Sequence, residues 1–222
     1  MSDYPAFPKI PRLNRDICIT EKIDGTNGLV FIREYAPGDD GVYHHSGETH
    51  VVGTDNRYYV RAGSRNRWLE PTKLHDNHGF AAWVAENAEI LVRNLGIGHH
   101  YGEWWGQGIQ RGYGLKTKKF SLFNTARYAF FEDDENPKAK ILSEDAVRAG
   151  LDIVPTLYRG SDLPISLAVD HELNLLALGG SVAAYDFDRP EGVVVFHEAA
   201  RSYFKVLIEG DGAPKSLVGA AA

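Results

Sequence analysis

The sequence predicts a sheet-dominated α+β protein, and three features of its hydrophobic pattern favour that class. Short runs of alternating or β-branched residues recur from residue 17 to residue 208. Between them lie one long amphipathic segment with helical periodicity and two shorter helical segments. No internal repeat, low-complexity tract or long Gly/Ser linker divides the chain, so we expect a single domain over residues 1–222.

The strands are predicted from runs of alternating, β-branched or aromatic residues. Three prolines before residue 12 deny a helix to the amino-terminal segment, which we expect to be extended. Residues 17–22 form the first predicted strand, and a turn at Asp24-Gly25 predicts a hairpin in which residues 29–32 return. A polar loop is predicted over residues 37–47. Further strands are predicted at residues 51–52, 58–60, 100–105, 120–125, 192–196 and 203–208.

Three helices are predicted from apolar residues that recur every three or four positions. The first begins near residue 77 and ends at Gly96. The other two begin near Ser143 and Ser166, where a serine hydroxyl can accept hydrogen bonds from the free amides of the first turn, and Gly179-Gly180 ends the last one. The core face of the first helix is predicted to contain Phe80, Trp83, Val84, Ala88, Leu91, Val92 and Leu95.

The composition predicts a globular protein of the cytoplasm. A chain of 222 residues that is 43% hydrophobic can bury one sizeable core. The single Cys18 cannot form an internal disulfide, and no apolar run is long enough for a bilayer span or a secretory signal, so we expect no membrane partner. A net charge of -6 argues against a protein that coats nucleic acid through bulk charge, although a local basic patch stays compatible with it.

Lys22, in the sequence EKIDGTNG at residues 21–28, is the candidate nucleophile. A free lysine titrates near pH ~10.4, so a nucleophilic lysine needs burial or a neighbouring cation to favour the neutral amine. A tight turn at Asp24-Gly25 would keep the backbone close to a bound nucleotide, and Thr26 and Asn27 add hydrogen-bonding groups. Taken alone, the pattern Lys-x-Asp-Gly fits an exposed hairpin lysine better than a nucleophile.

Five further segments contain residue types suited to phosphoryl transfer. This chemistry depends on cations around the α-phosphate and on carboxylates that hold Mg²⁺. Arg65 and Lys205 are suitable cations, and Glu191 is a suitable carboxylate. The segments are GSRNR at 63–67, YGEWWG at 101–106, FSLFN at 120–124, EGVVV at 191–195 and FKV at 204–206.

In this order the segments resemble the motifs of the covalent nucleotidyltransferases, the superfamily of polynucleotide ligases and mRNA-capping enzymes. The resemblance implies two antiparallel β-sheets around a nucleotide cleft, with helices flanking them. It also implies a role for each matched residue: Lys22 as nucleophile, Arg65 on phosphate, Glu103 on the ribose, Phe123 on the purine, Glu191 on the metal and Lys205 on the α-phosphate. Glu21, Ile23 and Asn27 complete the implied nucleotide-binding set.

Several of these residues also have structural interpretations. An aromatic residue in a strand is more often core than a platform for a base, so we expect only one of Phe120 and Phe123 to stack on adenine. Glu103, between aromatic residues, needs a partner for its charge. Alone, Glu191 could cap a turn, and Lys205 could be a solvated lysine on an edge strand.

Within the superfamily, GTN after the nucleophile resembles the type 2, nick-sealing RNA ligases, and the resemblance runs from about residue 5 to residue 208. Two features depart from that pattern. Tyr203 stands where such ligases often have a first lysine, which leaves only Lys205. The sequence also ends shortly afterwards, so we expect no OB-type or RNA-ligase-specific carboxy-terminal domain. Whether a partner protein takes the place of that domain is open.

The function predicted from the sequence is that of an ATP-dependent RNA ligase. It would use ATP and Mg²⁺ or Mn²⁺ to join a 3′-hydroxyl to a 5′-phosphate through a lysyl-AMP. No sequence feature indicates recognition of the 2′-hydroxyl that distinguishes RNA from DNA, so a DNA nick ligase is the nearest alternative. A GTP-dependent capping guanylyltransferase and a noncatalytic module that binds a nucleotide or nucleic acid are the other two.

Two further groups of residues lead to predictions. The basic, glycine- and tyrosine-containing segment 111–119 is either a solvated loop or, together with Arg57, Arg61 and Arg67, a rim that binds phosphate. The histidines at 44–45 and 99–100 are adjacent pairs, whose side chains point to opposite faces of a strand, and no cysteine pair accompanies them. We therefore expect no zinc site.

Overall fold

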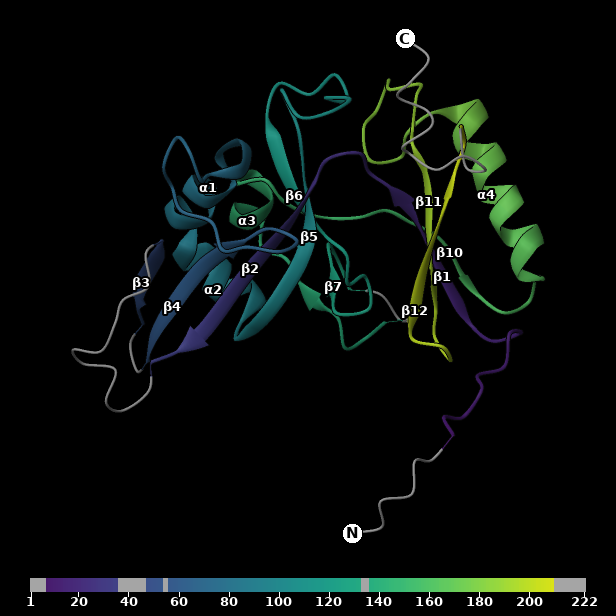
Figure 1. Cartoon of the computed structure of the whole chain (residues 1–222), viewed down its shortest axis with the longest axis horizontal. Coiled ribbons are helices and arrows are strands. Elements are labelled where there is room, and N and C mark those ends of the chain that lie inside the picture. Colours follow the sequence, from purple (N-terminus) through teal and green to yellow (C-terminus); the bar gives the residue numbers. More distant parts are fainter. Residues whose placement is uncertain (1–6, 36–46, 54–55, 133–135, 210–222) are drawn as a thin grey trace. The chain divides into compact units, whose positions relative to one another are not determined.

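A computed structural model describes residues 7–35, 47–53, 56–132 and 136–209 (Figure 1). The chain divides into two compact units: unit 1 comprises Met1–Lys22 and Pro155–Ala222, and unit 2 comprises Ile23–Val154. In the described residues, unit 1 combines a sheet with one helix and unit 2 a sheet with several, which confirms the α+β class. None of the helices in the described ranges is long and apolar enough to cross a membrane. A single domain over 1–222 stays a prediction.

Unit 1 is built on an antiparallel sheet with the strand order β10-β1-β11-β12. Helix α4 (Ile165–Gly179) packs against β1, β10 and β11, and Ala168, Val169 and Leu176 form a core with Ile17 and Ile19. Because β1 lies between two strands, both of its hydrogen-bonding edges are occupied. The strands are β1 (Ile17–Lys22), β10 (Thr156–Gly160), β11 (Gly192–His197) and β12 (Ser202–Leu207).

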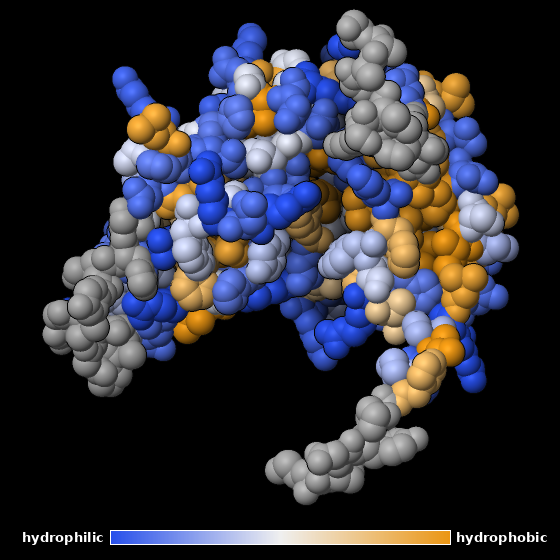
Figure 2. Space-filling model, viewed as in Figure 1, coloured by the Kyte–Doolittle hydropathy of each residue, from blue (hydrophilic) through white to orange (hydrophobic). Residues whose placement is uncertain are grey.

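Helix α4 exposes leucines among the polar residues of its outer side. Orange residues gather in Figure 2 on the side of unit 1 where Figure 1 draws α4. Leu167, Leu175 and Leu178 are exposed there, while Leu176 is buried. This distribution explains why the helical pattern of residues 166–178 shows no clean polar face.

Unit 2 is built on a six-stranded sheet with the order β3-β4-β2-β5-β6-β9. All neighbours are antiparallel except β6 and β9, which are parallel. Helix α1 packs on β4, and α2 packs on β3, β4 and α3, so their apolar faces and the sheet enclose the larger core. The strands are β2 (Thr26–Glu34), β3 (Glu48–Val52), β4 (Arg57–Gly63), β5 (Gly98–Gly106), β6 (Lys118–Leu122) and β9 (Leu151–Ile153). The helices are η1 (Asn77–Gly79), α1 (Phe80–Glu86), α2 (Ala88–Leu95) and α3 (Glu144–Arg148), and β7 (Tyr128–Ala129) pairs with β8 (Lys140–Ile141).

The hairpin predicted at Asp24-Gly25 is wrong. β1 pairs with β10 and β11, and β2 pairs with β4 and β5, so the two strands belong to different sheets. Alternation along residues 17–22 specifies a strand and its faces but not the partner. The short turn signal between two strands therefore marks the passage from one sheet to the next.

The long helix predicted to end at Gly96 is present as two helices. Asn87 separates α1 from α2 with φ -108° and ψ 15°, outside the helical region. The predicted core face is confirmed on both sides of this break, with Phe80, Val84 and Leu91 buried. Gly96 follows α2 as predicted.

The predicted serine caps are wrong. Ser143 precedes α3, but its hydroxyl donates to Asn94 Oδ1 at 2.9 Å instead of accepting from the helix. Ser166 lies inside α4, which starts after Pro164. At Ser143 a distant partner takes the place of the cap, whereas Ser166 is not at the start of its helix. Strands β7, β8 and β9, of two or three residues each, were not predicted, and neither was β10. Residues 37–46 of the predicted loop lie outside the described ranges.

Gly28 of β2 and Gly102 of β5 face each other and make room for aromatic rings. A Cβ built on Gly28 would lie 2.7 Å from Phe80 Cζ and 2.8 Å from Phe120 Cε2. The rings of Phe80 and Phe120 pack 5.0 Å apart in the core, where they have little space to move.

We expect Gly28→Ala to lower the free energy of unfolding by about 1–3 kcal/mol, because the added methyl overpacks the core. Urea denaturation measures this difference. Gly179→Ala is the matched control, since no heavy atom lies within 4 Å of its Cβ position, and it should be close to neutral. Equal effects of the two substitutions would contradict the packing argument.

Buried His100 couples the stability of unit 2 to pH. Its Nδ1 lies 2.8 Å from the hydroxyl of Tyr128, and its Nε2 lies 2.8 Å from the carbonyl oxygen of Gly96. Burial lowers the pKa of His100 to about 4; the bond to Gly96 opposes this shift, and nearby cations such as Arg127 add to it. The neutral imidazole is therefore the form that the fold accommodates.

We expect the free energy of unfolding to fall as the pH is lowered from about 6.5 to about 4. Across this interval the unfolded chain binds a proton on His100 that the folded chain excludes, so protonation favours unfolding. Urea titrations at several pH values measure the slope. His100→Gln removes the titrating group and should flatten the dependence; an unchanged slope in this variant would rule out His100 as its source.

Candidate nucleotide-binding site

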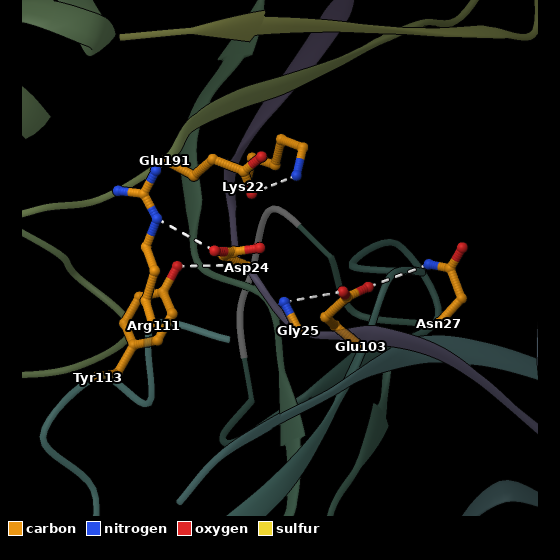
Figure 3. Close-up of polar contacts among 8 residues, drawn as sticks. All are labelled: Lys22, Asp24, Gly25, Asn27, Glu103, Arg111, Tyr113 and Glu191. Atoms are coloured by element: carbon orange, nitrogen blue, oxygen red, sulfur yellow. Dashed lines mark hydrogen bonds and ion pairs between the residues drawn. The ribbon is translucent and has the colours of Figure 1, made fainter. Parts of the chain in front are cut away.

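Lys22 is the last residue of β1, and its ammonium forms an ion pair with the carboxylate of Glu191 (Figure 3). The side chains are 21% and 9% exposed, so the pair is shielded but reachable from solvent. Glu191 directly precedes β11, whose Gly192 lies opposite Lys22. Two residues predicted from separate motifs are therefore in contact.

Gly192 brings β11 and β12 unusually close beside this ion pair. Its φ is +149°, and a Cβ at this position would lie 2.2 Å from the carbonyl oxygen of Val206. Only glycine fits such an approach of two backbones. Gly192 thus permits the close contact of β11 with β12, and the carboxylate of Glu191 directly precedes this contact.

Lys205 lies on the same face of the sheet in unit 1 as Lys22. Lys205 is opposite Val194, and Val194 is opposite Thr20, two residues before Lys22 in β1. Side chains that alternate along a strand share a face with their direct cross-strand neighbours. The opposite face carries Ile19 and packs on α4, so both candidate cations lie on the open face.

Glu21 points the other way and is fully engaged within unit 1. Its buried carboxylate accepts hydrogen bonds from Ser181 Oγ at 2.6 Å, from the amide of Val182 at 2.8 Å and from the amide of Ala183 at 2.9 Å. Burial raises the pKa of Glu21, and these hydrogen bonds partly offset the rise. The carboxylate ties the end of β1 to the segment after α4; its predicted part in nucleotide binding stays a prediction.

In unit 2, Glu103 forms the centre of a second polar cluster (Figure 3). It is buried in β5 and accepts hydrogen bonds from the amide of Gly25 at 3.1 Å and from Asn27 Nδ2 at 3.0 Å. Arg65 Nε donates to Asn27 Oδ1 at 2.9 Å. Arg65, Asn27 and Glu103, predicted from three motifs, are therefore linked, and the partner expected for Glu103 is present.

Phe120 and Phe123 differ in the way that the sequence suggested. Phe120 is fully buried and packs in the aromatic core, whereas Phe123 is 37% exposed. β6 ends at Leu122, so Phe123 lies just beyond the strand, where its amide donates to the carbonyl of Tyr101 at 3.0 Å. Of these two rings, only that of Phe123 is accessible to a ligand. Ile23 is buried.

Sequence reasoning missed the residues that hold Asp24. Tyr113 Oη accepts a hydrogen bond from the amide of Asp24 at 2.8 Å, and Arg111 Nε donates to Asp24 Oδ2 at 3.1 Å. Both residues come from segment 111–119, in which only basic and aromatic composition was visible. The guanidinium groups of Arg57 and Arg61 lie over the rings of Tyr35 and Trp68.

Across the described ranges, His, Cys, Asp and Glu form no group of three or more that could hold a metal ion. The carboxylate nearest the candidate nucleophile is Glu191, a single ligand. Mg²⁺ is commonly bound by one or two carboxylates together with substrate phosphates, so one carboxylate is compatible with a metal that arrives with a nucleotide.

A family model described as RNA ligase matches residues 15–207. The chain belongs to the RNA ligase family. The match includes every predicted site residue from Glu21 to Lys205. No curated protein matches the chain.

Solved structures of Naegleria gruberi RNA ligase variants are similar to this member of the RNA ligase family. A variant with ATP and Mn is 19% identical, with a TM-score of 0.48 over 87% of this chain and 49% of that chain. A variant with AMP and Mn is 18% identical, with a TM-score of 0.48 over 88% and 50% of the two chains. The present chain thus spans about half the length of these proteins.

We expect Glu21→Ala to lower the free energy of unfolding by about 1–3 kcal/mol, because it leaves the partly buried amides of Val182 and Ala183 without their acceptor. Urea denaturation measures the loss. Glu86→Ala, at an exposed position at the end of α1, is the control and should change stability by less than about 0.5 kcal/mol. Similar losses of unfolding free energy in both variants would show that the hydrogen bonds to Glu21 do not stabilise the fold.

Proposed function

We propose that this chain is an ATP-dependent RNA ligase of the nick-sealing kind. It would join a 3′-hydroxyl to a 5′-phosphate end through a lysyl-AMP on Lys22. The observation that carries the proposal is the ion pair of Lys22 with Glu191 at the end of β1. The ion pair joins the candidate nucleophile to the carboxylate proposed for the metal, two residues from separate motifs, in a chain of the RNA ligase family.

The first step is the transfer of an adenylyl group to Lys22. The carboxylate of Glu191 favours the charged ammonium, so Lys22 would first lose one proton to solvent. The neutral amine then attacks the α-phosphorus of ATP, a nitrogen–phosphorus bond forms, the bond to the bridging oxygen breaks, and pyrophosphate leaves. The nitrogen loses a second proton to water. Lys205, on the same sheet face as Lys22, would stabilise the negative charge on the α-phosphate.

Two further transfers complete the reaction. A 5′-phosphate oxygen of the RNA attacks the phosphorus of the lysyl-AMP, the nitrogen–phosphorus bond breaks, and Lys22 regains its proton. The 3′-hydroxyl then attacks the 5′-phosphate, a phosphodiester forms, and AMP leaves with the bridging oxygen. The hydroxyl proton goes to solvent. Each step exchanges one bond to phosphorus for another, so no oxidant or additional cofactor is needed.

Arg65, Glu103 and Phe123 of unit 2 are proposed to bind the nucleotide. Glu103 would accept a hydrogen bond from the ribose, Arg65 would contact phosphate, and the exposed ring of Phe123 would stack on adenine. Asn27 links Arg65 to Glu103, and only a few residues separate it from Lys22 in sequence.

A divalent metal, Mg²⁺ or Mn²⁺, fits the single carboxylate of Glu191. When bound there with the phosphates of ATP, it would neutralise charge on them. The Naegleria gruberi RNA ligase structures with ATP or AMP and Mn are consistent with this choice. RNA with 5′-phosphate and 3′-hydroxyl ends is the proposed partner, and a partner protein remains open.

We expect the purified protein to gain the mass of one adenylyl group after incubation with ATP and Mg²⁺, and Lys22→Ala to abolish this gain. Intact-mass spectrometry measures both, and acid treatment should remove the group because a nitrogen–phosphorus bond is acid-labile. Lys138→Ala, at an exposed position, is the control and should be labelled like the wild type. Absence of an adduct on the wild-type protein would refute the proposal and favour a noncatalytic module.

The same assay separates the remaining alternatives. Labelling by GTP and not by ATP would favour a capping enzyme. With the adenylylated protein, nicked duplexes that carry a ribose or a deoxyribose at the 3′ end should show faster sealing of the ribose end. Equal or faster sealing of the deoxyribose end would overturn the assignment to RNA.

A further inference from the structure

Two consecutive amides beside the candidate nucleophile are held by side chains of unit 2 (Figure 3). The amide of Asp24 donates to Tyr113 Oη at 2.8 Å, and the amide of Gly25 donates to Glu103 Oε1 at 3.1 Å. Arg111 Nε binds the carboxylate of Asp24 at 3.1 Å. A segment without regular secondary structure is therefore fixed by three separate hydrogen bonds.

Tyr113 is itself fixed by its surroundings. Its ring is buried, with 1% exposed, and meets the ring of Trp105 edge-on at a centroid distance of 4.9 Å. Its φ is +51°, a left-handed conformation that few residues other than glycine adopt. Such a conformation persists where packing determines it, and the buried ring meets that condition.

The segment that carries Tyr113 is a closed, hydrogen-bonded loop between β5 and β6. The amide of Gln107 donates to the carbonyl of Thr117 at 3.0 Å, which closes its base. Inside it, the amide of Gly112 donates to Ile109 at 2.8 Å, and Ile109 is buried. The loop is thus preorganised to present the hydroxyl of Tyr113 and the guanidinium of Arg111.

These contacts give Tyr113 and Arg111 a role that neither interpretation of segment 111–119 included. A buried ring offers no face on which an RNA base could stack, and it is not a solvated side chain either. Arg111 neutralises Asp24 in an ion pair whose side chains are 36% and 27% exposed. The loop therefore serves the chain's own segment at Asp24, which lies two residues after Lys22.

We propose that Tyr113 and Arg111 are positioning residues for the attack of Lys22 on ATP. By holding Asp24, they restrict the backbone rotations of the segment that directly follows Lys22. Reactions of this kind depend on alignment, and a misplacement of about 1 Å can lower the rate about 100-fold. The inference rests on the proposed function, because it concerns the same lysyl-AMP.

Tyr113→Phe tests this role, since it keeps the ring that packs on Trp105 and removes only the hydroxyl. We expect the rate of lysyl-AMP formation at saturating ATP to fall about tenfold, as for loss of one hydrogen bond to a shielded amide. The KM for ATP should change less than about twofold, because neither residue is proposed to touch the nucleotide. Tyr185→Phe, at a side chain that is 92% exposed, is the control and should match the wild type.

Arg111→Gln is the second variant, chosen because its half-exposed side chain can be replaced without opening the core. It should also lower the rate at saturating ATP and leave the KM for ATP nearly unchanged, with a melting temperature close to that of the wild type. Arg111→Lys, which keeps the charge, should restore part of the rate.

The outcomes separate this inference from the proposed function. A wild-type protein that forms no adduct overturns both. A wild type that forms the adduct, together with Tyr113→Phe and Arg111→Gln at the wild-type rate, overturns the positioning role alone. If Tyr113→Phe unfolds at the assay temperature, Arg111→Gln decides: a reduced rate in the folded variant supports the role, and an unchanged rate overturns it.

Discussion

Pairing of β1 on both of its edges is the constraint on which the candidate site depends. β11 pairs with all six residues of β1, and β10 pairs with Ile17 to Thr20, so the strand is held on both edges up to two residues before Lys22. Lys22 itself pairs with β11 alone, which places it opposite Gly192 and next to Glu191. The core of α4 against Ile17 and Ile19 then fixes which face of the strand is open.

Alternation along β1 places a side chain that stabilises the fold and the candidate nucleophile at adjacent positions. Glu21 faces the core side and binds amides of the segment after α4, while Lys22 faces the open side. Unit 2 repeats this division: Phe120 fills the core, and Phe123, just past the strand, stays accessible. Lys22 and Phe123 both stand at the end of a strand, where a side chain can be fixed by the sheet and still meet a ligand.

Much of this arrangement could be predicted from the sequence. Hydrophobic periodicity gave β1, β11, β12 and the core face of α1 and α2, because these signals are local. The order of short motifs brought Lys22 and Glu191 together although 168 residues lie between them. The pairing of strands could not be predicted, because alternation along a strand does not specify its partner. The hairpin predicted at Asp24-Gly25 was wrong for that reason. The contact of Tyr113 with the amide of Asp24 could not be predicted either, because a hydrogen bond between a side chain and a backbone amide leaves no sequence pattern in either segment.

The order of the elements along the chain sets the time at which this site can exist. Unit 1 is discontinuous: β1 is made first, and unit 2 and β10 precede its other neighbour, β11. Contacts between residues so far apart form late and slowly compared with those of a local hairpin. On the ribosome, unit 2 can complete its sheet while Lys22 still lacks β11 and Glu191. A nascent chain is therefore without its paired lysine until nearly all of the described residues have been synthesised.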